Sequence, residues 1–321
     1  MSIWLWIGFL ALVLGLLGLD LGVFNRKSHV IGVREALGWT VFWVVLSLVF
    51  NLCVYYMYAH NWLGVGLETG HELTGKQAGL QFLTGYVIEK SLSLDNIFVI
   101  ALIFSYFKVP GEFQHRTLFW GVLGALVLRG VMIAAGTALI RRLDWMIYVF
   151  GGLLLLTAVK LLFEKHESVD PDRNPLVRAA RRILPISKSF EGEHFFTRVD
   201  GKFAATPLLL VLLVVESSDV MFAVDSIPAV LAVTQDPFLV FTSNVFAILG
   251  LRSLYFALAA IMEKFRYLKF SLVVILGFVG AKMLLSHYYP IPTAVSLCVI
   301  ASVLLIGMLA SSAAAPANTP R

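Results

Sequence analysis

The chain has 321 residues, of which 59% are hydrophobic and 14% are charged, and its formal net charge is +5. Soluble domains carry about 25% charged residues, so this composition excludes an ordinary soluble enzyme, a disordered chain and a disulfide scaffold. It indicates an all-α polytopic membrane protein, because helices satisfy their own backbone polar groups in lipid.

Apolar runs of about 20 residues, the length that spans a bilayer, recur along the chain. The first run has no Lys or Arg before it and exceeds the apolar length of a signal peptide, so we expect a retained helix. Nine transmembrane helices are predicted, at Ile3–Phe24, Gly38–Tyr58, Gln81–Phe107, Thr117–Ile140, Trp145–Phe163, Thr206–Thr234, Pro237–Met262, Phe270–Ser286 and Ile291–Ala310.

Basic residues in the connections predict the orientation. Seventeen lie on one side of the spans, eight of them in the segment 164–205, and three lie on the other side. Cytoplasmic connections carry the excess of Lys and Arg, so we expect the amino terminus outside and the carboxyl terminus in the cytoplasm. The positive net charge is then an orientation signal, and no nucleic-acid partner is predicted.

The segment 164–205 is polar. Asp200-Gly201 between apolar flanks predicts a two-residue hairpin turn, and "RAARRIL" indicates a basic amphipathic stretch for the inner membrane surface. Two interpretations of the segment are a regulatory loop and a solvated connector between two halves. Cys53 and Cys298 fall in predicted spans without a CxxC partner, and we expect them to be buried as small hydrophobic residues.

Eleven charged residues remain inside the predicted spans. Each charge at a helix centre costs roughly 2.5–3.5 kcal/mol, so such residues face the bundle interior and mark ion or proton pathways. Long side chains near span ends, as at Lys160 and Lys282, are expected to reach the interface. The eleven are Asp20, Glu89, Lys90, Asp95, Arg129, Lys160, Glu216, Asp219, Asp225, Arg252 and Lys282.

Most of these charges repeat in one order: two acids six residues apart, then an Arg in the next span and a Lys in the span after it. Three helices per copy place the copies in opposite orientations, and inverted repeats hold substrate sites near the midplane where they meet. The first set is Glu89, Asp95, Arg129 and Lys160, and the second is Asp219, Asp225, Arg252 and Lys282.

The repeat divides the chain into six segments. They are two N-terminal helices with an outer loop (1–80), a first three-helix repeat (81–163), a cytoplasmic loop (164–205), a second inverted repeat (206–286), a last transmembrane helix (287–310) and a disordered tail (311–321).

The spacing of the acids predicts how they point. Six residues turn an α-helix through about 600°, so the acids of each pair lie about 120° apart, whereas Glu216 and Asp219 share a face. Pro228 lacks the N–H that would bind the carbonyl of Val224, so we expect the helix to kink or open there, which frees a carbonyl oxygen beside Asp225. Oxygen ligands suit Mn²⁺, Mg²⁺ or Ca²⁺, and the His residues all lie in connections or at span ends. Structural pairing of the acids with the intramembrane bases is the alternative.

Four segments carry a distinctive pattern around these residues: "GYVIEKSLSLDNIFV", "VVESSDVMFAVDSIPAV", "TSNVFAILGLRSLYF" and "EHFFTRVDGKFAATPLLLVL". They resemble the TerC integral membrane family, specifically its Alx-type members, from about Gly38 to Pro292. The resemblance implies a bacterial cytoplasmic membrane protein, associated with tellurium resistance and manganese export, whose metal is cargo and which needs no cofactor. The site residues it implies are Glu89, Asp95, Glu216, Asp219 and Asp225, with Asn96, Ser226 and Asn244 as helpers.

The favoured hypothesis is a secondary transporter, not an enzyme, that exports a divalent cation, above all manganese, and contributes to metal homeostasis and stress resistance. The sequence holds no GxxxxGK[ST] motif, so ATP drive within it is not expected. One alternative is a membrane scaffold for stress-response or metalation partners. Another is an intramembrane aspartyl enzyme, although neither Asp95 nor Asp225 stands in the GxGD element usual for such proteases.

Overall fold

The computed structural model describes residues 3–19, 32–65, 73–143, 145–163, 174–187, 189–199, 201–259 and 268–313. These residues are mostly helical, and six helical segments among them are long and apolar enough to cross a bilayer. The chain is therefore an all-α integral membrane protein with several spanning helices. The six segments are Val33–Ala59, Gly111–Arg142, Met146–Phe163, Pro207–Leu231, Pro237–Leu258 and Thr293–Ser311.

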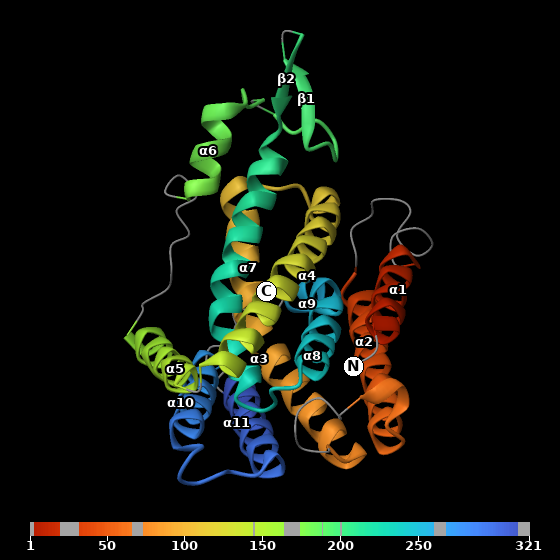
Figure 1. Ribbon diagram of the computed structural model, residues 1–321. Helices are drawn as coiled ribbons and strands as arrows, with labels where there is room; N and C mark the ends of the chain where they lie inside the picture. The colour runs from red at the N-terminus through yellow and green to blue at the C-terminus, as the bar shows by residue number, and fades with distance from the viewer. Residues whose placement is uncertain are drawn as a thin grey trace.

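Helices make up nearly all of the ribbon in Figure 1, and a hairpin, the one sheet among the described residues, stands beyond one end of them. The helices are α1 (Ile3–Leu19), α2 (Val33–Ala59), α3 (Gly75–Phe107), α4 (Gly111–Arg142), α5 (Met146–Phe163), α6 (Pro175–Ile183), α7 (Pro207–Leu231), α8 (Pro237–Leu249), α9 (Leu251–Ala259), α10 (Leu268–Leu285) and α11 (Thr293–Ala313). The 3₁₀ turn η2 (Trp62–Gly64) follows α2, and the strands β1 (Phe196–Val199) and β2 (Lys202–Ala205) precede α7. Each predicted span overlaps one of these helices or the pair α8 and α9, but the count of nine spans stays a prediction.

The longest helix, α3, begins six residues before its predicted start. Thr74 caps it: the Thr74 hydroxyl accepts the backbone N–H of Gln77, and the Gln77 side chain accepts the backbone N–H of Thr74. This reciprocal capping box satisfies two N–H groups that a helix start otherwise leaves open. With 33 residues the helix is about 50 Å long at 1.5 Å per residue, so it reaches beyond the hydrocarbon core of a bilayer.

Helix α7 does not open at Pro228: it stays helical through the proline and ends at Leu231. The N–H of Ala232 reaches the carbonyl of Pro228 at 3.0 Å, and a kink at Pro228 stays a prediction. An interruption lies instead at Gly250, which separates α8 from α9 inside the span predicted as one helix.

Helix α8 lies at the centre of the bundle. Asp236 caps it, since its Oδ1 atom accepts the backbone N–H groups of Phe238 at 2.9 Å and Leu239 at 3.3 Å. Every residue from Phe238 to Leu249 is buried. Helices α2, α3, α4 and α7 surround it, so α8 contacts protein on all of its faces.

Aromatic rings fasten the first helices to this centre. Phe50 of α2 contacts Phe246 of α8 in a tilted arrangement with ring centroids 4.6 Å apart, and Phe82 of α3 meets the same ring edge-on at 6.2 Å. Phe9 of α1 contacts both Phe50 and Phe246. Four helices therefore share one aromatic cluster.

Four further helix contacts form a reciprocal pattern. Helix α3 packs on α7, and α5 packs on α10. Helix α4 packs on α7, and in the corresponding way α3 packs on α8. The α5–α10 crossing depends on glycine: a Cβ on Gly151 would lie 3.1 Å from the carbonyl oxygen of Gly280, and one on Gly280 would lie 3.0 Å from that of Gly151. Small residues at such crossings let two backbones approach closely.

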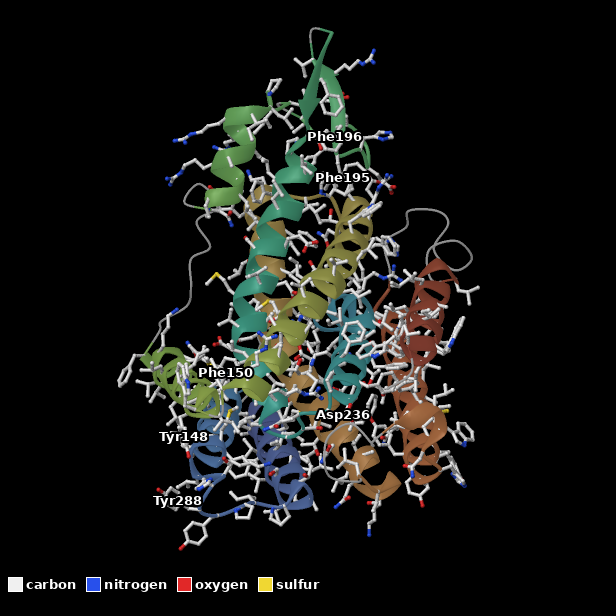
Figure 2. The ribbon with its side chains drawn as sticks, viewed as in Figure 1. Tyr148, Phe150, Phe195, Phe196, Asp236 and Tyr288 are labelled. Atoms are coloured by element: carbon white, nitrogen blue, oxygen red, sulfur yellow. The ribbon has the colours of Figure 1, made fainter. Side chains whose placement is uncertain are left out.

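Helix α6 and the hairpin lie at one end of the bundle (Figure 1), where Val177 of α6 packs into the same apolar cluster as Leu208 of α7. The hairpin is confirmed: Val199 pairs with Lys202 in an antiparallel register, and Gly201 holds a positive φ of 76° that its turn requires. Asp200 lies outside the described residues. Figure 2 shows Phe196 in the hairpin and Asp236 far from it, toward the opposite end of the helices.

Two smaller expectations are corrected. Cys53 on α2 and Cys298 on α11 are exposed free thiols, not buried residues, because hydropathy does not distinguish a lipid-facing position from an interior one. Helix α11 runs to Ala313, three residues into the predicted tail. Residues 314–321 and Asp20 lie outside the described part of the chain.

Candidate functional site

Arg129 of α4 lies inside the bundle between α3, α7 and α8, and its side chain is only 2% exposed. Its guanidinium pairs with the carboxylate of Glu89 on α3. It also binds Asp219 on α7 through two hydrogen bonds, Nε to Oδ2 at 3.2 Å and Nη2 to Oδ1 at 3.0 Å. The planar fork of Arg matches two carboxylate oxygens in this way.

Two neutral side chains complete the surroundings of Arg129. Its Nη1 atom donates to Ser226 Oγ at 3.3 Å and to Asn244 Oδ1 at 3.2 Å. The Asn244 amide donates in turn to the carbonyl of Val240 at 3.1 Å, which turns its oxygen toward the guanidinium. Ser226 lies seven residues, or two helical turns, after Asp219, so both face α4 from the same side of α7.

Three buried acceptor oxygens near this cluster have no hydrogen-bond donor within the described residues: Glu89 Oε2, Asn96 Oδ1 and Glu216 Oε2. Glu89 is fully buried and Asn96 is 3% exposed. Buried acceptors without donors are costly and uncommon, so their presence points to a water molecule or a cation that interacts with these oxygens.

A glycine on α4 makes room for Glu216. A Cβ at Gly124 would overlap the carboxylate of Glu216, so a residue with a side chain cannot lie there while Glu216 keeps its position. Glu216 and Asp219 are one turn apart on α7 and repel each other when both are ionised. The absence of a side chain at Gly124 therefore makes room for the Glu216 carboxylate near the Asp219 carboxylate, which Arg129 binds.

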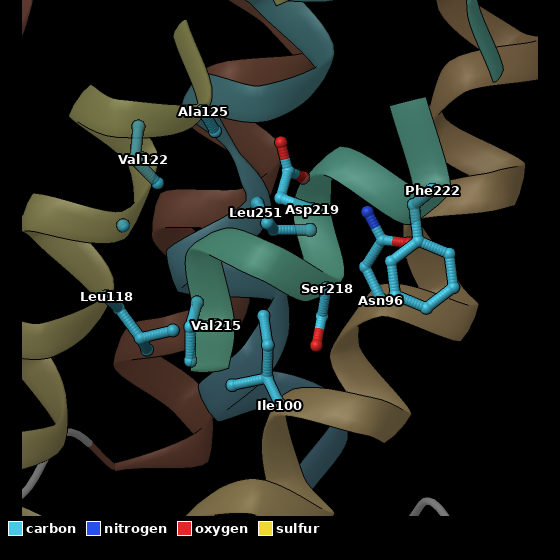
Figure 3. A pocket seen from close by; sticks show the side chains of 11 residues that line it. Asn96, Ile100, Leu118, Val122, Ala125, Val215, Ser218, Asp219, Phe222 and Leu251 are labelled. Atoms are coloured by element: carbon cyan, nitrogen blue, oxygen red, sulfur yellow. The ribbon is translucent and has the colours of Figure 1, made fainter. Parts of the chain in front are cut away.

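A small cavity of about 20 Å³ adjoins the cluster. Figure 3 shows Asn96 of α3, and Ser218 and Asp219 of α7, among the apolar side chains that line it. A volume of this size holds about one water molecule. The cavity is therefore large enough for a single small ion or water next to the Asp219 carboxylate.

The second acid of each predicted pair lies elsewhere. Asp225 accepts a hydrogen bond from Thr157 Oγ1 of α5 at 2.8 Å, and Lys160 of α5 is close enough to attract it. Asp95 is half-buried on α3, six residues beyond Glu89. The 120° rotation over six residues directs the two acids of one helix toward different neighbours.

The structure thus divides the eight predicted site residues. Arg129 gathers four of them directly, and Asn96 and Glu216 lie beside that group. Asp225 faces α5, and Asp95 lies about 120° around α3 from Glu89. Within the described ranges, no three carboxylate, imidazole or thiolate side chains come close enough together to hold a metal ion. The four that contact Arg129 are Glu89, Asp219, Ser226 and Asn244.

Two intramembrane lysines are enclosed as well. Lys90 of α3 donates to the carbonyl of Ala247 at 3.2 Å, near the interruption at Gly250, where positive charge favours a helix carboxyl end. Lys282 is 8% exposed, so the expectation that it reaches the interface is wrong. Lys160 is exposed, as its predicted place near a span end requires.

A larger cavity of about 240 Å³ opens at the end of the bundle opposite α6. It is lined by the connection from α7 to α8, by Gln81 and by Ser286. In that connection the buried Asp236 accepts the hydroxyl of Tyr58 at 2.9 Å. Burial raises the pKa of the Asp236 carboxyl, and the hydrogen bonds from Tyr58 and the α8 backbone act in the opposite direction.

Several residues of these sites carry no distinctive signal in the sequence. Thr157 and Asp236 are polar residues of ordinary types, and Tyr58 lies 178 residues away from its partner. Gly124 follows a glycine at position 121 in an apolar stretch, where it resembles any small residue of a membrane helix. Their roles depend on which helices become neighbours.

Comparison with known proteins gives one consistent match. The model of the integral membrane protein TerC family matches residues 74–319. No solved structure matches the chain.

Three relatives cover nearly all of the chain. It is 52% identical over 307 residues to an uncharacterized membrane protein of Myxococcus xanthus. This match covers 96% of this chain and 91% of the relative. It is 49% identical over 306 residues to the "Putative membrane-bound redox modulator Alx" of Salmonella typhi, with 95% and 92% covered. The protein of the same name in Escherichia coli K12 is 48% identical over 303 residues, with 94% and 92% covered.

Proposed function

We propose a transport function for this chain, which belongs to the TerC family of integral membrane proteins. It exports a divalent cation, above all Mn²⁺, across the cytoplasmic membrane of a bacterium and so contributes to metal homeostasis. The observation that carries the proposal is the buried cluster of carboxylate and amide oxygens around Arg129, in which three acceptor oxygens lack donors among the described residues.

The chemistry of this cluster favours a hard cation. Glu89, Glu216 and Asp219 bring three carboxylates near one guanidinium, so the group holds more negative than positive charge. Carboxylate, amide and hydroxyl oxygens are the ligands of Mg²⁺, Ca²⁺ and Mn²⁺, whereas Zn²⁺ and Cu²⁺ recruit imidazole and thiolate. The preference for Mn²⁺ among the hard cations, and the outward direction, rest on the family resemblance.

The helix contacts support an inverted repeat as the transport framework. If residues 81–163 and 206–286 are two copies, α3 corresponds to α7, α4 to α8 with α9, and α5 to α10. Exchanging the copies turns the α4–α7 contact into the α3–α8 contact and leaves the α3–α7 and α5–α10 contacts unchanged, and all four contacts are present. The cluster lies between the copies, where inverted repeats hold their substrates, and rocking of one copy on the other gives alternating access.

The distribution of Lys and Arg sets the proposed orientation. The amino terminus is outside, the carboxyl terminus is inside, and α6 with the hairpin is cytoplasmic. The 240 Å³ cavity beside Asp236 then opens to the outside, on the path that an exported ion takes after it leaves the cluster. Lipid and the cation are the partners this proposal requires, and it assigns no catalytic residue and no cofactor.

The relatives named as redox modulators suggest a different activity, yet the thiols of this chain do not favour it. Cys53 and Cys298 lie on different helices, α2 and α11, and neither forms a disulfide. Dithiol chemistry needs two sulfur atoms that can meet. An altered redox balance in the cell is, in this proposal, a consequence of altered manganese export.

Purified protein in liposomes of known orientation tests the proposal. Wild-type protein is expected to move Mn²⁺ down its gradient faster than empty vesicles do, and Mg²⁺ and Ca²⁺ are added as competitors. Asp219→Asn is expected to lose most of this flux. Glu193→Gln, which removes a partly exposed acid that pairs with Arg116 outside the bundle, is the matched control and should keep it. If vesicles that contain the wild-type protein pass none of the three cations faster than empty vesicles do, transport is refuted.

A further inference from the structure

The guanidinium of Arg129 lies where a bound cation is expected. Its donors face Asp219, Glu89, Ser226 and Asn244, the oxygen-bearing side chains assembled at the repeat interface. A guanidinium and a metal ion both neutralise carboxylates, so one such cluster is able to hold either in turn.

The spacing of the acids suits a guanidinium better than it suits a metal ion. No three acidic, imidazole or thiolate side chains in the described ranges form a group compact enough for a metal ion, although three acids lie in or beside the cluster. The guanidinium stands between Glu89 on α3 and Asp219 on α7 and binds both. The guanidinium must therefore be withdrawn from Asp219 before that carboxylate can turn to a small ion.

The partners of Arg129 fall into two groups that a rocking movement would separate. Glu89 belongs to the first three-helix copy, as Arg129 does. Asp219, Ser226 and Asn244 belong to the second copy. A displacement of one copy relative to the other therefore withdraws the guanidinium from three of its four partners and leaves its pair with Glu89 intact.

We propose that Arg129 is a tethered cation that alternates with the cargo: it neutralises the cluster when the transporter is empty and leaves it when a divalent cation binds. This inference rests on the proposed transport function and adds a mechanism for the empty transporter. Uncompensated carboxylates inside a bilayer are costly, so an empty carrier without a substitute cation does not readily return through the membrane. With Arg129 in place it returns without carrying a counter-ion.

The inference predicts a specific separation of binding, exchange and net flux. Arg129→Met keeps the length of the side chain and removes its charge. It is expected to bind Mn²⁺ about tenfold or more tightly, within the usual range for coupled sites, because no internal cation competes. Exchange of Mn²⁺ for Mn²⁺ across the vesicle membrane continues, because the carrier is always loaded. Net Mn²⁺ efflux falls by about tenfold or more, because the empty carrier is trapped.

The experiment compares four proteins: wild type, Arg129→Met, Arg129→Lys and Lys282→Met. Mn²⁺ affinity is measured by electron paramagnetic resonance of the free ion, and exchange and net efflux are measured in the same liposome preparation. Arg129→Lys keeps the charge and is expected to fall between wild type and Arg129→Met, which also provides the test if Arg129→Met does not fold. Lys282→Met removes a buried cation outside the cluster and should keep the wild-type ratio of exchange to net efflux.

The outcomes separate the inference from the proposed function. Equal or weaker Mn²⁺ binding in both Arg129 variants, or a parallel loss of exchange and net efflux, would make Arg129 a purely structural residue and overturn the inference while transport stands. Wild-type protein that neither binds nor moves Mn²⁺, Mg²⁺ or Ca²⁺ would overturn the transport function itself.

Discussion

Arg129 and Asp219 join α4 to α7 through two hydrogen bonds of 3.2 Å and 3.0 Å inside the membrane-spanning bundle. The pair connects segment 81–163 with segment 206–286, and its acid is 11% exposed. A charge pair in this position contributes to the stability of the fold and also marks the centre of the candidate cation site. The first prediction separates these two contributions.

Asp219→Asn is expected to lower the free energy of unfolding by about 3–5 kcal/mol, because it leaves part of a buried guanidinium uncompensated. Chemical unfolding in detergent measures the loss. Glu193→Gln removes a partly exposed partner of Arg116 and should cost no more than about 1 kcal/mol. Similar losses in both variants would contradict the burial argument.

Gly124→Ala is expected to displace the Glu216 carboxylate, because the new Cβ would overlap it. Overpacking of this kind costs about 1–3 kcal/mol, and Mn²⁺ affinity should fall with it. In a Glu216→Ala background the same substitution should cost little, and a double-mutant cycle measures the difference. Gly277→Ala on α10, where a Cβ meets open space, is the control. An additive cycle would show that Gly124 does not act through Glu216.

Gly151→Leu should separate α5 from α10, because the backbone of α10 lies within 3.1 Å of the added Cβ position. Its neighbour Gly152 has nothing within 4 Å of that position, so Gly152→Leu adds the same side chain without a clash. We expect Gly151→Leu to lower the free energy of unfolding by about 1–3 kcal/mol more than Gly152→Leu does. Unfolding curves of the two variants provide the comparison, and equal curves would rule out the close crossing.

Tyr58→Phe removes the hydroxyl that reaches Asp236. Burial raises the pKa of Asp236, so the contribution of this group to stability declines as the pH rises through that pKa and the carboxyl ionises. The Tyr58 hydroxyl opposes the decline by stabilising the carboxylate. Its loss should therefore cost about 1.5–3 kcal/mol at neutral pH and less in acid, where Asp236 is protonated.

Unfolding measured at several pH values checks this dependence. Tyr56→Phe, on the same helix with an exposed ring, supplies the control and should have little effect at any pH. A cost of Tyr58→Phe that grows on acidification would contradict the expected sign.

The spans and the hairpin were predictable because their signals are local. Apolar length locates a helix to within a few residues, and Asp200-Gly201 between apolar flanks is sufficient to predict the hairpin. Helix α3 extends beyond its apolar run because Thr74 and Gln77 form a cap, which is also a local signal. At Pro228 the local signal predicted a kink or an opening, and helix α7 nevertheless continues to Leu231.

The candidate site was predictable only in part. The unusual position of acids within apolar spans was enough to select Glu89, Glu216 and Asp219, and the 120° rotation over six residues indicated that paired acids would diverge. The central place of Arg129 was not predictable, because it depends on α4 packing against α7 and α8. A sequence records that a charge is buried but not which helix supplies its partner.

Helix α8 is enclosed by α2, α3, α4 and α7, and this enclosure determines how a change in the membrane reaches the centre of the protein. A change in bilayer thickness or lipid composition acts first on helices with lipid-facing surface, such as α2 and α11, which tilt or shift to match it. Asn244 on α8 experiences such a change only through those neighbours. The side chains at the centre of the bundle are therefore protected from changes in the surrounding lipid, because the outer helices adjust to those changes first.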